Sequence, residues 1–222
     1  MLVQAIDFAL DPDDQGKGHA LLGTVSAVLA PVDWTQFNDF MAANPALDHP
    51  LDTWGRQQTK RMIEKTALVA HFPDDQPAFP MISRALTVFP TLSQSPLGML
   101  VSTRFGLLFG IRAWVEGDRA SVERLAVSLG WKAGSPKHSP CDACVDKPCL
   151  THCPVGAFDA HGYDYPKCQV ELHRQMSGKG DLCWRGGCAA RVACPLSTQY
   201  TAEQAGFHHR AVVANMMLVD GE

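Results

Sequence analysis

The cysteines of this chain are gathered in one stretch and are spaced as metal ligands are. All eight lie beyond residue 140. The first run is Cys141-x2-Cys144-x4-Cys149-x3-Cys153-Pro154, and the second is Cys168 followed by Cys183-x4-Cys188-x5-Cys194-Pro195. Thiolates bind soft metals and iron–sulfur clusters, and short gaps let one loop wrap a single centre. The spacing therefore predicts a metal centre, with electron transfer as its chemistry, in the last third of the chain.

The proline after the last cysteine of each run indicates how the ligands are shared. A [4Fe–4S] cluster takes four thiolates, and in chains with two clusters the cysteine before proline ligates the cluster of the other run. Proline there removes a hydrogen-bond donor and turns the chain away. We therefore expect two [4Fe–4S] clusters that use all eight thiols, one on Cys141, Cys144, Cys149 and Cys194 and the other on Cys153, Cys168, Cys183 and Cys188.

Other uses of these residues are weaker. Two structural zinc sites are the main alternative, but zinc ribbons favour two Cys-x2-Cys knuckles and this chain has one. A disulfide framework is disfavoured in a reducing compartment. Histidine can replace cysteine at iron. Because eight cysteines already complete two clusters, His138, His152 and the His208–His209 pair are interpreted as surface or supporting residues.

Composition limits the class of protein. The chain has 222 residues, 46% of them apolar, which is enough for a buried core. Its net charge of −4 argues against a nucleic-acid binder that depends on positive charge. The start has no basic segment typical of a secretory signal. The longest apolar stretch, residues 97–115, is interrupted by Arg104 and Arg112, so we expect no membrane span and a cytoplasmic location.

The pattern of apolar residues predicts an α+β fold in two parts. Residues 1–131 are expected to form a small mixed α/β region, and residues 132–222 a loop-rich ferredoxin-like module with two clusters. Leu107, Phe109, Ile111, Ala113 and Val115 alternate and are expected to share one face of a strand. Further strands are expected over 2–10, 20–30 and 67–72, a hairpin from 97–101 and 107–115, and helices over 33–43, 52–65, 80–88, 118–130 and 201–217.

The cysteine motif resembles a known module. The segment Cys-Asp-Ala-Cys-Val-Asp-Lys-Pro-Cys-Leu-Thr-His-Cys-Pro (141–154) resembles bacterial two-[4Fe–4S] ferredoxins. The long gap to Cys168 and the run ending in Cys194-Pro195 are similar to the variant in epoxyqueuosine reductases and reductive dehalogenases. Residues 95–110 are also similar to the hairpin before the clusters in epoxyqueuosine reductase. This resemblance implies cobalamin as a possible further cofactor. Residues 77–86 carry no acid where those reductases have a catalytic acidic residue.

Three functions follow from these observations. In the first, the chain is an electron carrier that takes single electrons from one redox protein and passes them to another. In the second, it is a reductase whose clusters feed a site in residues 1–131 that binds cobalamin, a flavin or a substrate. Asp74 and Asp75 are the nearest candidate acids there, although a solvated pair is the simpler interpretation. In the third, the clusters are structural or sense oxygen or iron.

Overall fold

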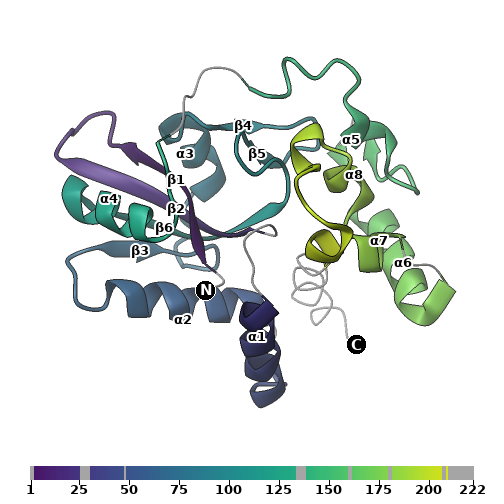
Figure 1. Cartoon of the computed structure of the whole chain (residues 1–222), viewed down its shortest axis with the longest axis horizontal. Coiled ribbons are helices and arrows are strands. Elements are labelled where there is room, and N and C mark those ends of the chain that lie inside the picture. Colours follow the sequence, from purple (N-terminus) through teal and green to yellow (C-terminus); the bar gives the residue numbers. More distant parts are fainter. Residues whose placement is uncertain are drawn as a thin grey trace.

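A four-stranded antiparallel sheet organises the first part of the chain (Figure 1). In this computed structural model the described residues are 3–25, 31–47, 49–133, 139–159, 162–179, 182–206 and 209. The strand order is β1-β2-β6-β3. The strands are β1 (Gln4–Leu10), β2 (Lys17–Val25), β3 (Val69–His71) and β6 (Phe109–Asp118). The predicted mixture of helices and strands is confirmed.

Both faces of this sheet are covered. On one face, α2 (Pro50–Ile63) and α4 (Arg119–Ser128) pack over a core that includes Leu22 and Val115. On the other face, α3 (Met81–Val88) and the ribbon of β4 (Leu92–Gln94) and β5 (Leu100–Ser102) enclose Trp114, which is fully buried. Helix α1 (Pro31–Ala43) lies next to the N-terminal end of α2. A strand that is buried on both faces has a nearly continuous apolar sequence, and residues 107–115 have such a sequence.

The predicted single apolar face of β6 is wrong, and a β-bulge is the reason. Leu22 pairs with Ala113 and the next residue, Gly23, pairs with Ile111, so Arg112 is an extra residue in β6. Such a residue shifts the alternation of side chains by one. Ala113 and Val115 therefore pack under α4, whereas Phe109 and Ile111 pack on the opposite face, with Trp114.

The predicted hairpin between 97–101 and 107–115 is also wrong. Strand β5 pairs with β4, and β6 pairs with β2 and β3. Only one bridge, between Ser102 and Gly106, links the two sides of the turn. Alternating apolar residues identify a strand, but they do not identify its partner, which is decided here by the sheet that buries both faces of β6.

Helix α4 begins and ends as the sequence predicts. The Asp118 carboxylate accepts a hydrogen bond from the Ser121 backbone N–H at 3.0 Å, which caps the first turn. The helix ends at Ser128, and Gly130 follows with φ of 83°, the left-handed conformation that glycine adopts without strain. Val122 and Ala126 are fully buried against the sheet.

The cysteine-containing part consists of short helices and strands joined by loops. It contains α5 (Pro148–Thr151), α6 (Tyr165–Arg174), α7 (Leu182–Gly186) and α8 (Ala189–Val192), together with the two-residue strands β7 (Phe158–Asp159) and β8 (Gly162–Tyr163). It also has a π-helical turn, Gln175–Lys179, and a 3-10 turn, Pro195–Ser197. Most of these helices are too short to show a periodic pattern in the sequence. Of the predicted helix over 201–217, residues 202–206 are helical, and most of the remainder lies outside the described residues.

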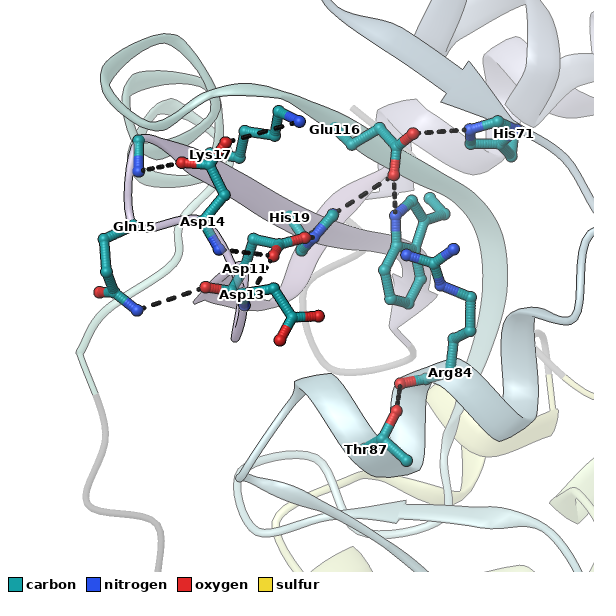
Figure 2. A network of polar contacts seen from close by, with 12 residues as sticks. Asp11, Asp13, Asp14, Gln15, Lys17, His19, His71, Arg84, Thr87 and Glu116 are labelled. Carbon is teal, nitrogen blue, oxygen red and sulfur yellow. Dashed lines mark hydrogen bonds and ion pairs between the residues drawn. The ribbon is translucent and has the colours of Figure 1, made fainter.

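Two histidines and two carboxylates join three strands of the sheet (Figure 2). His19 Nε2 lies 2.8 Å from Asp11 Oδ2, and His71 Nε2 lies 3.2 Å from Glu116 Oε1. The other oxygen of Glu116 accepts from Trp114 Nε1 at 3.2 Å. The hydrogen bond from His19 lowers the pKa of Asp11. This network fixes β3 and the β1–β2 turn to β6, and we assign it a structural role.

Asp7 gives a pH-dependent prediction. Its buried carboxylate accepts from Phe8 N at 2.8 Å, Trp131 Nε1 at 3.2 Å and the Thr91 hydroxyl, yet burial raises its pKa. A raised pKa in the folded state favours folding at low pH, and this contribution is lost as pH rises through that pKa. We expect the free energy of unfolding of the wild type, relative to Asp7→Asn, to rise as the pH falls from 8 to 4. Anaerobic urea unfolding followed by tryptophan fluorescence measures it, and a pH-independent difference would contradict it.

Candidate metal centre

Four thiols surround a first cavity at the junction between β5 and the cysteine-containing part. The cavity has a volume of about 220 Å³, and its walls include Val101, Leu107 and Leu196. Its cysteines are Cys141, Cys144, Cys149 and Cys194. The predicted first ligand set is therefore brought together, including the thiol that comes from the second run.

The other four thiols surround a second cavity. Its lining includes Cys153, Cys168, Cys183 and Cys188, with Phe158, Leu172 and His209 completing the walls. Its volume is only about 20 Å³, roughly the space of one water molecule. A cluster fits there only if these side chains move outward. Cys153, the last cysteine of the first run, therefore lies with three cysteines of the second run.

Short structural elements fix each thiol in place. Cys149 is in α5, which follows Lys147 in a left-handed conformation (φ 40°). Cys168 is in α6, whose first turn is capped by Asp164 through the Lys167 N–H at 3.0 Å. Cys188 and Cys194 are the N-cap residues of α8 and of the 3-10 turn. Such terminal positions place a side chain beside several free backbone N–H groups.

Some of those N–H groups point at sulfur. Ala157 N lies 3.2 Å from Cys153 Sγ. Backbone N–H groups also donate to Cys183, from Ala189, and to Cys188, from Ala190 and Arg191. Hydrogen bonds of this kind stabilise thiolate and tune the potential of a cluster bound to it. Without metal, burial raises the pKa of the Cys183 and Cys188 thiols, so loading must displace protons.

A cluster and a single ion require different arrangements of thiols. A zinc ion requires four sulfurs at about 2.3 Å from one point. A [4Fe–4S] cluster takes one thiolate at each of four iron atoms, so its ligands must surround a volume. The first cavity has a volume of about 220 Å³, and four thiols are part of its lining. Within the described ranges, no three His, Cys, Asp or Glu side chains are grouped as ligands of one metal ion, and all eight cysteines are free thiols.

The contacts of three supporting residues could not be identified from the sequence. Gln175 Oε1 accepts from the N–H groups of Cys183 and Trp184, at 2.7 and 3.0 Å, and holds the start of α7. Tyr163 stacks on Phe158 with ring centroids 4.7 Å apart and hydrogen-bonds to Cys168. Arg191 donates through Nε to Leu107 O at 2.8 Å and through Nη2 to Phe109 O at 2.9 Å, joining α8 to the segment that leads into β6.

Other residues considered from the sequence lie elsewhere. Asp74 and Asp75 both pair with Arg56, and Asp75 also accepts a hydrogen bond from Phe72 N at 2.7 Å. The two carboxylates therefore stabilise the loop in which they lie. His152 Nδ1 bonds its own helix at Pro148 O, 2.8 Å away. His209 lines the second cavity. His138 and His208 lie outside the described residues.

Comparison with known proteins gives no further assignment: no family model, curated protein or solved structure matches this chain. The site is therefore interpreted from its own geometry. Among the described residues, no helix combines the length and apolar character needed to cross a bilayer.

Proposed function

We propose that this chain is an electron-transfer protein that carries two [4Fe–4S] clusters, and that its cysteine module is related to that of two-cluster ferredoxins and epoxyqueuosine reductases. The observation that carries the proposal is the crossed grouping of thiols: Cys194 lines the cavity of the first run, and Cys153 lines that of the second. The crossed pattern is typical of chains that hold two clusters side by side. Single electrons would enter from one redox protein and leave to another.

Iron and sulfide analysis tests this proposal directly. Protein reconstituted anaerobically is expected to be brown, to hold about eight iron and about eight sulfide per chain, and to bleach reversibly with dithionite. The matched control is a Cys141→Ala/Cys168→Ala variant, which removes one thiol from each group and should retain little iron. A colourless protein with two zinc ions would contradict the proposal.

One observation favours a reductase as the second candidate function. A cavity of about 800 Å³ lies between α3, β6 and Arg191, and Leu107 borders both it and the first cysteine cavity. A cofactor or substrate held there would lie beside the first cluster. Anaerobic titration with hydroxocobalamin or a flavin, followed by absorbance, tests it: a one-to-one complex that dithionite reduces through the clusters supports the reductase, and no complex with either excludes these cofactors.

A further inference from the structure

The 800 Å³ cavity has mainly apolar walls. Phe79, Met81, Ile82, Leu86, Met99 and Ile111 all contribute to its surface. Ile82 and Leu86 lie one turn apart on α3 and are 58% and 36% exposed, whereas Met81 and Ala85 on the same helix are buried in the core. Helix α3 therefore has one apolar face in the core and another that lines the open cavity. An apolar molecule bound in the cavity would explain the second of these faces, because it would cover it.

Two arginines also line the cavity. Arg112 is 7% exposed; its Nη1 pairs with Asp52, and its buried Nε–H has no hydrogen-bond partner among the described residues. It is also the extra residue of the β6 bulge, a feature that directs a side chain away from the regular ladder. Leaving a buried donor unpaired costs about 1–3 kcal/mol. A ligand oxygen removes this cost if the Arg112 side chain turns so that Nε faces the cavity.

Arg191 adds a second positive charge to the same wall. Its guanidinium donates to the main-chain carbonyls of Leu107 and Phe109, which are neutral, and it is close enough to Arg112 for the two charges to repel. Arg112 is buried and Arg191 is half-buried; the Asp52 carboxylate pairs with Arg112, and Arg191 is attracted electrostatically by the Cys188 sulfur. An anionic group on a ligand would reduce this repulsion.

We propose that this cavity binds an organic anion with an apolar body, of the aromatic carboxylate kind, with its carboxylate at Arg112 and its ring on Phe79, Ile82 and Leu86. The inference deepens the second candidate function by naming the class of molecule that the cavity takes. Binding itself needs no electron transfer, so it can succeed or fail independently of the clusters.

The probes are 2-naphthoate and 2-naphthylmethylamine, which share a ring system and carry opposite charges at pH 7. In calorimetric titration of the intact, cluster-loaded protein, 2-naphthoate is expected to bind with a Kd below about 1 mM and at least about tenfold more tightly than the amine. Ile82→Glu places a carboxylate on the cavity wall and should weaken naphthoate about tenfold while strengthening the amine. Arg112→Lys should weaken naphthoate by removing the Nε–H donor.

Val127→Glu is the matched control. Val127 is 55% exposed on α4, which packs on the opposite face of the sheet from α3, so naphthoate affinity should stay within about twofold of the wild type. Because Ile82 and Val127 are both exposed, neither variant is expected to unfold. No saturation by naphthoate, equal affinity for the two probes, or no effect of Ile82→Glu would overturn the proposal. Iron analysis of the same samples reports separately on the clusters.

Discussion

Replacing Cys194 with alanine is expected to destroy the first cluster and spare the second, although Cys194 belongs to the second cysteine run. Replacing Cys153 should do the reverse. In each variant iron should fall from about eight to about four per chain, because a cluster that loses one of its four thiolates is no longer held. The reason is geometric: Cys194 lies with Cys141, Cys144 and Cys149, and Cys153 lies with the other three.

Reference variants make the assignment unambiguous. Cys141→Ala removes a ligand that either arrangement gives to the first cluster, and Cys168→Ala removes one that either gives to the second. The electron paramagnetic resonance spectrum of reduced Cys194→Ala should therefore match that of Cys141→Ala, and Cys153→Ala should match Cys168→Ala. If the matches were exchanged, each run would hold its own cluster, and the crossed grouping would be wrong.

The grouping of the eight thiols around two cavities was predictable because it depends on local spacing and one chemical rule. Cys153 and Cys194 are each followed by proline, and this alone assigned them to the opposite groups. Helix α4 was predictable for a similar reason. Asp118 is a typical N-cap residue, Val122 and Ala126 are apolar residues at helical spacing, and Gly130 is typical of the position after a helix end. Signals of this kind act within a few residues of the chain.

Features that depend on distant partners were not predictable. The bulge at Arg112 exists because β6 must pair with β2 while burying side chains on both faces, and nothing within 107–115 indicates the extra residue. The large cavity forms from α3, β6 and α8, which are separated by up to about a hundred residues. The bridge that Arg191 makes from α8 to β6 could not be predicted, because its partners, two main-chain carbonyls, carry no sequence signal.

Arg191→Met is the second change with a large expected effect. The substitution leaves the carbonyls of Leu107 and Phe109 without their guanidinium donor at a packed junction. Each unsatisfied buried acceptor costs about 1–3 kcal/mol, so we expect the free energy of unfolding to fall by about 3 kcal/mol. Because α8 also carries Cys188 at its N-cap, iron should be lost on mild heating at a lower temperature than from the wild type.

The effect of the Arg191 charge on the cluster potential should be separable from the effect of its hydrogen bonds on stability. Its guanidinium acts electrostatically on the half-buried Cys188 sulfur, and a nearby positive charge makes reduction of a cluster easier. Arg191→Lys keeps the charge but cannot bridge two carbonyls, so it should be destabilised with little change in potential. Arg191→Met should be destabilised and should also lower the potential of the second cluster.

Arg185→Met is the control, because Arg185 is exposed on α7 and its charge is screened by solvent. Potentiometric titration followed by electron paramagnetic resonance measures the potentials. Equal shifts in the Met and Lys variants would show that Arg191 acts through structure alone.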